Sequence, residues 1–184
     1  TVAGLFRSVT RKLPVAVAAV LPSVFLDVPA GFAAHPNKPF TLTAQTAFID
    51  ALFAVKPKNA ADYVETATEA DSERTVLFFV ESAQMLQTFA RSTPVTAVLA
   101  DSRALVAATR DGRAIVLLPV DWIRWTQAYE TAAREIASRA KAELGASRLE
   151  LRTTGRLSDV ARTNTSTLGF TIDERVALNG SGAP

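Results

Sequence analysis

The 184-residue sequence contains no cysteine and only one histidine. The absence of cysteine excludes disulfides, thiolate metal sites and cysteine nucleophiles from this chain. A zinc site would need carboxylates almost alone, because proteins bind zinc mainly through cysteine and histidine. A serine–histidine–aspartate triad would have to use His35, and no G-x-S-x-G turn accompanies it. We therefore expect neither a metal nor a cofactor.

Glycine is scarce, and long apolar runs and an excess of one charge are missing. The eight glycines are scattered, and none belongs to a phosphate-binding loop of either common spacing. A membrane-spanning helix needs about 20 consecutive apolar residues, and the sequence predicts no transmembrane segment. The 20 basic and 18 acidic side chains leave a net charge of +2 and are interspersed along the chain. This mixture argues against a nucleic-acid partner, which usually requires basic residues gathered on one face.

The sequence does have the composition of a folded domain. Hydrophobic residues make up 48% and charged residues 21%, close to the averages for globular proteins. The length suits one domain with an additional arm. We divide the chain into an N-terminal arm (residues 1–40), a single α/β domain (residues 41–178) and a tail (residues 179–184).

Within the N-terminal arm, residues 7–34 allow two interpretations. Three basic residues precede an apolar stretch that begins at Leu13, and small residues follow near Gly31, which is the order of a secretory signal. Asp27 and three prolines interrupt the stretch, which favours an apolar structural arm instead. The arm interpretation favours the cytoplasm, whereas a signal would direct the protein to the periplasm or outside the cell.

Apolar periodicity predicts alternating helices and strands in residues 41–178. Such alternation is typical of the α/β or α+β class, with a single mixed sheet of about five strands packed by helices. Helices are predicted at 43–55, within 59–74, at 83–92 with Ser82 as the cap, at 121–144 and within 157–169. Strands are predicted at 74–80, 94–100, 113–120, 147–154 and 170–178.

The segment before Gly112 has two interpretations. Asp111-Gly112 between apolar runs is a strong hairpin signal, which makes residues 102–110 a strand. Ser102 can instead cap a short alanine-rich helix that ends at Gly112. The strand that follows Gly112 is expected in both cases.

The clearest predicted element is a long amphipathic helix over residues 121–144, with Asp121 as its cap. Apolar residues recur along it at steps of three and four, and glutamate–arginine pairs at i, i+4 line its wet side. Trp122, Trp125 and Tyr129 share one face of this helix. An aromatic stripe at that spacing usually packs in a core, but aromatic residues are also the commonest binding anchors when uncovered. These three residues are therefore the candidate partner surface.

Carboxylates supply the candidates for an enzymatic role. Glu81 and Asp101 each follow a predicted strand, where α/β sheets place ligand groups. Together with Glu65 and nearby arginines they would serve a carboxylate-dependent, hydrolase-like enzyme. The acidic cluster over residues 65–73 lacks the residue order of a calcium loop, which favours a solvated surface.

Residues 75–120 carry an ordered set of features. A strand runs into "ESAQMLQTFA", and a "PVTAVL" strand, an "SRALV" segment, Asp-Gly and a closing apolar strand with a proline follow. This order resembles the N-terminal domain of the SseB-like (enhanced serine sensitivity) family. The resemblance implies a non-enzymatic α+β module from bacterial regulatory or secretion-associated settings, and a helix at residues 102–110. The resemblance assigns no function to any residue of this chain.

We expect a non-catalytic protein-interaction or structural module of bacterial origin, with a protein partner or a second copy of itself in a larger assembly. The missing catalytic motifs and the apolar arm support this expectation. The alternatives are the carboxylate-dependent hydrolase-like enzyme and, if residues 7–34 are a signal, a secreted periplasmic binding protein.

Overall fold

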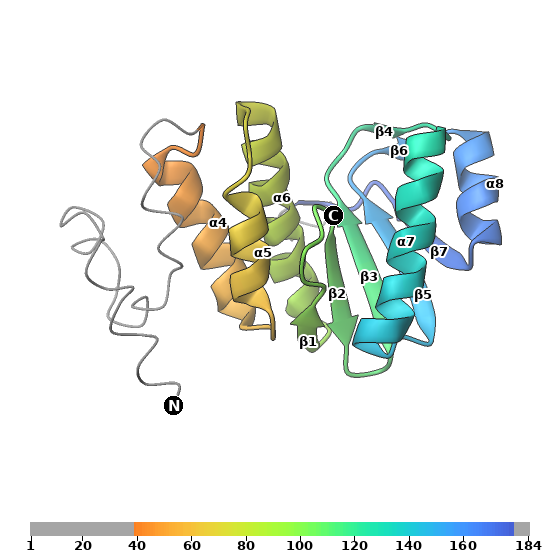
Figure 1. Cartoon of the computed structure of the whole chain (residues 1–184), viewed down its shortest axis with the longest axis horizontal. Helices are drawn as coiled ribbons and strands as arrows, with labels where there is room; N and C mark the ends of the chain where they lie inside the picture. The colour runs from red at the N-terminus through yellow and green to blue at the C-terminus, as the bar shows by residue number, and fades with distance from the viewer. Residues whose placement is uncertain (1–38, 179–184) are drawn as a thin grey trace, which may run out of the picture.

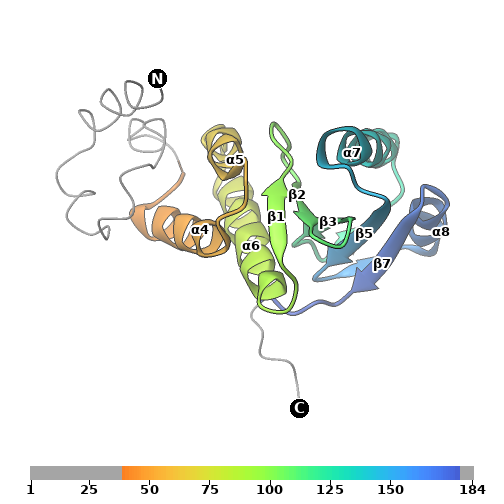
Figure 2. The same ribbon diagram turned by 90° about the horizontal axis from the view of Figure 1, so that it is seen from below.

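Helices cover both faces of a central sheet (Figures 1 and 2). The computed structural model describes residues 39–178. The predictions for the N-terminal arm, the signal-like segment 7–34, His35 and the tail 179–184 therefore lie outside the described residues. On one side of the sheet, α6 (Glu73–Ala90) and α5 (Ala60–Ala67) contact the strands, and α4 (Leu42–Val55) packs against α6 farther from the sheet. Helices α7 (Gln127–Leu144) and α8 (Asp159–Thr167) lie on the other side. No helix within 39–178 combines the length and hydropathy needed to cross a membrane.

The sheet is mixed and has five strands in the order β1-β2-β3-β5-β7, which confirms the predicted fold class. Its first three strands are antiparallel neighbours, and its last three are parallel neighbours. Parallel neighbours need a crossover connection, and α7 and α8 supply the two crossovers. The strands are β1 (Val95–Val98), β2 (Leu105–Thr109), β3 (Arg113–Leu118), β5 (Arg148–Thr153) and β7 (Phe170–Glu174).

The β2–β3 hairpin decides between the two interpretations of residues 102–110. Leu105 pairs with Leu117 and Ala108 with Ala114, and Gly112 takes the positive φ of +80° that the tight turn requires. All five residues of β2 are buried. The helical alternative is therefore wrong, because burial on both faces of a central strand outweighs the helix preference of alanine.

Two of the helices on the α6 side follow the predictions. Helix α4 (Leu42–Val55) begins at Thr41, whose side chain accepts a hydrogen bond from the Ala44 N–H, and Pro57 follows its end. Its inner face buries Phe48 and Leu52 completely. Helix α5 (Ala60–Ala67) is the short helix expected within residues 59–74.

The predicted strand at residues 74–80 is wrong. Glu73–Ala90 form one helix, α6, and Ser72 caps it by accepting a hydrogen bond from the Thr75 N–H. Ser82, the predicted cap, is fully buried in the middle of this helix. A short apolar run fits a buried helix as well as a buried strand. Here the run continues the helical spacing of the following residues, and Leu77, 54% exposed, marks its outer side.

The long helix of the other layer, α7 (Gln127–Leu144), begins six residues later than predicted. Thr126 caps it by accepting a hydrogen bond from the Tyr129 N–H, so Asp121 is not the cap. The helix ends at the predicted residue, Leu144, and Gly145 follows it with a φ of +64°. The predicted i, i+4 pairs are present on its outer side; they join Glu130 to Arg134, Glu135 to Arg139 and Arg139 to Glu143.

The helix starts late because the preceding residues form a strand. Trp122–Ile123 are β4, which pairs in parallel with β6 (Arg156–Leu157) in a separate two-stranded sheet. Gly155 precedes β6 and lies so close to Asp121 that a Cβ atom there would come within 2.0 Å of the Asp121 carbonyl oxygen. After β6, Ser158 caps α8 (Asp159–Thr167), the helix predicted within residues 157–169.

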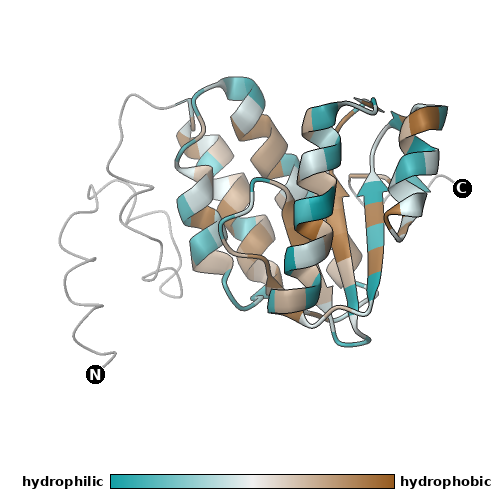
Figure 3. Cartoon of the chain, turned by 45° about the vertical axis from the view of Figure 1, so that its right-hand side comes forward, coloured by the Kyte–Doolittle hydropathy of each residue, from teal (hydrophilic) through white to brown (hydrophobic). Residues whose placement is uncertain are grey.

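The sheet separates two apolar clusters. Ile115 and Leu117 point into the cluster on the α6 side, whereas Val116 between them points into the cluster on the α7 side. This alternation follows from the two-residue period of a strand. Figure 3 shows the resulting concentration of apolar residues on the central strands.

Candidate functional site

The structure brings together only two of the three residues of the predicted partner surface. Trp125 and Tyr129 pack edge to face, with ring centroids 5.7 Å apart, and both lie against the apolar cluster on the α7 side. The Tyr129 hydroxyl is hydrogen-bonded to the Thr165 hydroxyl of α8 at 3.0 Å. Trp122 lies on β4 instead and is 52% exposed. Trp122 is therefore the member of the three that is available to a partner.

Trp122 lies beside two exposed arginines. Its neighbour in the β4–β6 register is Arg156, and neighbouring residues of paired strands project to the same face. Ile123 points inward and is buried, so Trp122 and Arg124 lie on the outer side of the segment. Within residues 39–178, neither Arg124 nor Arg156 forms an ion pair. We call Trp122, Arg124 and Arg156 the Trp122 surface.

An apolar cavity of about 150 Å³, partly open to solvent, lies between α7 and the sheet. Tyr129 and Ile136 line it from the helix, and Phe170 lines it from β7. Burial raises the pKa of Tyr129 above its ordinary value, and the Thr165 hydroxyl only partly opposes this shift. Tyr129 is therefore neutral at physiological pH. The remaining lining residues are Ala104, Val116, Leu118, Ala132, Ala133 and Leu151.

The three carboxylates proposed for catalysis lie on separate elements. Glu65 is on α5, Glu81 is in the middle of α6, and Asp101 is in the β1–β2 turn with a left-handed φ of +46°. Burial and the negative charge of Asp121 raise the pKa of Glu81. No three histidine, aspartate or glutamate side chains within the described part of the chain lie close enough together to hold a metal ion.

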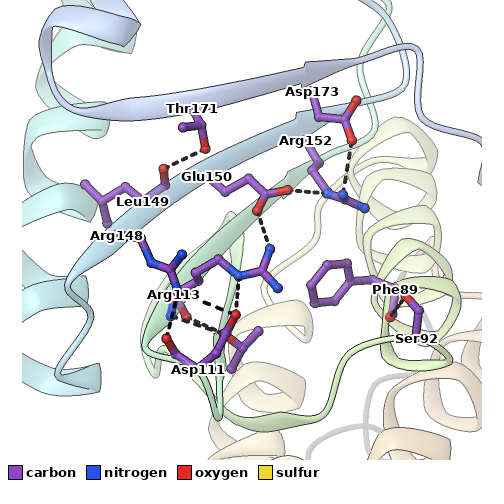
Figure 4. A network of polar contacts seen from close by, with 11 residues as sticks. Phe89, Ser92, Asp111, Arg113, Arg148, Leu149, Glu150, Arg152, Thr171 and Asp173 are labelled. Carbon is purple, nitrogen blue, oxygen red and sulfur yellow. Dashed lines mark hydrogen bonds and ion pairs between the residues drawn. The ribbon is translucent and has the colours of Figure 1, made fainter.

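A polar network covers part of the α6 face of the sheet (Figure 4). At its centre, the Glu150 carboxylate accepts hydrogen bonds from Arg113 Nη1 at 2.8 Å and from Arg152 Nε at 2.6 Å. The Phe89 ring lies beneath both guanidinium groups, 4.9 Å from that of Arg152 and 5.9 Å from that of Arg113. These contacts join the last turn of α6 to β3 and β5.

Each carboxylate of this network is already neutralised by an arginine. Asp111 pairs with Arg113 at 2.8 Å, and Asp173 on β7 pairs with Arg152 at 3.1 Å. Every carboxylate of the network therefore has an arginine partner. We interpret the network as a structural contact that fixes α6 to three strands.

Arg148, Glu150 and Arg152 alternate along β5 with Leu149 and Leu151, so the two-residue period of a strand places them on one face, as Figure 4 shows. Phe89 and Arg113 were missed, because they lie 61 and 37 residues before Glu150 in the chain and no local pattern connects them.

Comparison of the chain with protein-family models, with curated proteins and with solved structures finds no match, so the SseB-like resemblance stays a prediction.

Proposed function

We propose that this protein is a non-catalytic module that binds a protein partner through the Trp122 surface. The supporting observation is that Trp122 is 52% exposed and stands beside two arginines that have no ion-pair partner within residues 39–178. Tryptophan and arginine are the residue types most enriched among the binding hot spots of protein interfaces.

The Trp122 surface is held in place before any partner arrives. Buried Ile123 and Leu157 anchor β4 and β6 to the core, and the Ser158 N–H donates a hydrogen bond to the Ile123 carbonyl at 2.9 Å. A preorganised anchor loses little conformational entropy on binding, which favours affinity.

The charges of this surface point to an acidic partner. Arginine side chains bind carboxylates through paired, charge-assisted hydrogen bonds, and the exposed indole of Trp122 offers apolar area beside Arg156. We therefore propose that the partner presents aspartate or glutamate beside an apolar side chain. In the bacterial setting implied by the resemblance, this partner would be another subunit of an assembly.

The experiment is a selection of short displayed peptides on the full chain, followed by fluorescence anisotropy of labelled peptides. We expect the selected peptides to be acidic and to bind less tightly as salt increases, because exposed charges are screened. The variants W122A and R156Q should each weaken binding by about tenfold or more, as expected for a hot-spot residue.

The matched control is R134Q, which removes one positive charge from an exposed site on α7 that is not part of the Trp122 surface. If R134Q weakens binding as much as R156Q, net charge governs the interaction and the proposed surface is wrong. Unchanged binding by W122A would contradict the proposal as well.

A further inference from the structure

The cavity beneath α7 arises from the small side chains on the inner face of this helix. Ala133 and Ala140, seven residues apart on that face, are both buried, but only Ala133 lines the cavity. Tyr129 and Ile136 also line the cavity from the helix, and residues of β3, β5 and β7 line it from the sheet. The α7 residues that line the cavity therefore end at Ile136, and Ala140, one turn later, is fully buried outside it.

The lining of the cavity offers nothing to a charged or polar ligand. Every lining side chain is uncharged, and the Tyr129 hydroxyl is already hydrogen-bonded to Thr165. In residues 39–178, the buried polar side-chain atoms without a partner belong to Tyr63 and Ser82, and neither lines this cavity. A buried water molecule needs two to four polar partners, so water is held poorly here as well.

The size of the cavity agrees with its chemistry. Its volume is about 150 Å³, and apolar protein cavities of roughly this volume accept a molecule the size of benzene. We infer that the cavity beneath α7 is a binding site for a small uncharged hydrocarbon group, an aromatic ring or a short alkyl chain of comparable size. This site is independent of the Trp122 surface, because Trp122 does not line it.

Trp125 provides a reporter for this site. Its ring contacts Tyr129, which lines the cavity, and the sequence contains only two tryptophans. The variant W122F therefore leaves Trp125 as the single tryptophan. Titration of the full-length W122F chain with benzene should change the Trp125 emission in a saturable way and raise the midpoint of thermal unfolding, because a ligand that binds only the folded state stabilises it.

Benzoate tests whether the site takes only uncharged groups. It has the same ring with one added charge, and it should bind at least tenfold more weakly than benzene because the lining offers the carboxylate no partner. Equal binding of benzene and benzoate would overturn the inference.

The variants A133L and A140L place the same side chain on the same face of α7. A133L should fill the cavity, abolish the benzene-induced rise of the unfolding midpoint and unfold at no lower temperature than the unmodified chain. A140L has no space to occupy, so it should lower the midpoint but retain the rise with benzene. An unchanged response to benzene in A133L would overturn the inference.

Methyl NMR of the full-length chain makes the test independent of these variants. Benzene should shift the methyl resonances of Val116, Ile136 and Leu151, which line the cavity, and leave that of Met85 on α6 unchanged. No shift at the lining methyls would overturn the inference. So would contacts, seen before benzene is added, between these methyls and residues 1–38, because the chain itself would then fill the site.

Discussion

Tyr63 is the largest of the fully buried side chains in the described part of the chain. Its ring packs against Phe48 and Phe79, with centroid distances of 6.0 and 5.6 Å. The hydroxyls of Tyr63 and Ser82 lie near each other, but within residues 39–178 neither reaches hydrogen-bond geometry with a partner. Burial raises the pKa of Tyr63 far above its ordinary value, and nearby Ser82 opposes this shift only in part. The ring thus stabilises the core while the hydroxyl opposes burial.

We expect Y63F to raise the free energy of unfolding by about 1 kcal/mol, because it removes an unpartnered buried hydroxyl and keeps the ring. Urea unfolding measures this difference. The matched control is Y129F, which removes a hydroxyl that is bonded to Thr165 and should lower the free energy of unfolding by about 1 kcal/mol. A loss of stability in Y63F would mean that the hydroxyl of Tyr63 is satisfied in solution.

The titration of Glu81 makes the free energy of unfolding depend on pH. Burial and the charge of Asp121 raise its pKa in the folded chain, so the folded state binds the proton more tightly than the unfolded state. The ionised side chain therefore costs stability above its folded pKa, and this cost disappears below the ordinary pKa of about 4.3. We expect E81Q to be more stable than the unmodified chain at neutral pH.

Urea unfolding at pH values from about 3 to 7 tests this expectation. The two chains should be equally stable at about pH 3, where Glu81 is protonated in both states. D121N should reduce the same cost at neutral pH, because it removes the charge that faces Glu81. A less stable E81Q at neutral pH would show that the ionised carboxylate is favourable where it lies.

At the scale of elements, capping side chains determine where the helices begin. Thr126 accepts the hydrogen bond that starts α7, whereas Asp121 lies six residues before the helix. T126A should therefore lower the free energy of unfolding by about 1 kcal/mol, the usual cost of losing an N-cap. D121A should cause no comparable loss, and chemical denaturation compares the two variants directly. A larger loss in D121A would indicate that the helix extends to Asp121 in solution.

Sequence periodicity predicted most of the elements, because α4, α5 and α8 each bury one stripe of apolar residues and the central strands are short apolar runs buried on both faces. It failed where local patterns were ambiguous. The run at residues 74–80 suits a strand or a buried helix, and only the cap at Ser72 and the continuation to Phe89 identify α6. The start of α7 depends on the pairing of β4 with β6, residues about 34 apart in the chain, which no local pattern reveals.

The candidate sites were less accessible to sequence reasoning. Spacing alone placed Trp122, Trp125 and Tyr129 on one face, but exposure depends on the strand that separates Trp122 from the helix. The cavity depends on the distance between α7 and the sheet, which is set by side chains from four elements. Neither the exposure of Trp122 nor the distance between α7 and the sheet can be deduced from a local sequence pattern.

At the scale of the whole molecule, the sheet couples the two apolar clusters. Ile115 on β3 points to the α6 side, and Leu149 on the neighbouring strand β5 points to the α7 side. Since the same strands supply both clusters, we expect one cooperative unfolding transition. I115A and L149A should each lower the free energy of unfolding by about 2–5 kcal/mol, the usual cost of truncating a buried side chain.

Far-UV circular dichroism and tryptophan fluorescence check this coupling. Trp125 lies on the α7 side, so its fluorescence reports on the layer opposite Ile115. In I115A the two signals should change at the same urea concentration. A fluorescence transition that stays in place while the circular dichroism transition moves would show that the two layers unfold separately.

Gly155 constrains which sequences can adopt this arrangement. The Asp121 carbonyl oxygen occupies the space that any side chain at position 155 would need, and the Arg156 N–H bonds to that same oxygen. Natural variation can repack the apolar clusters as long as total volume is kept, but it cannot replace this glycine without moving β6 and the arginine beside Trp122. In homologous chains, a glycine one residue before the arginine that pairs with an exposed tryptophan would therefore be the most durable sequence signature of this surface.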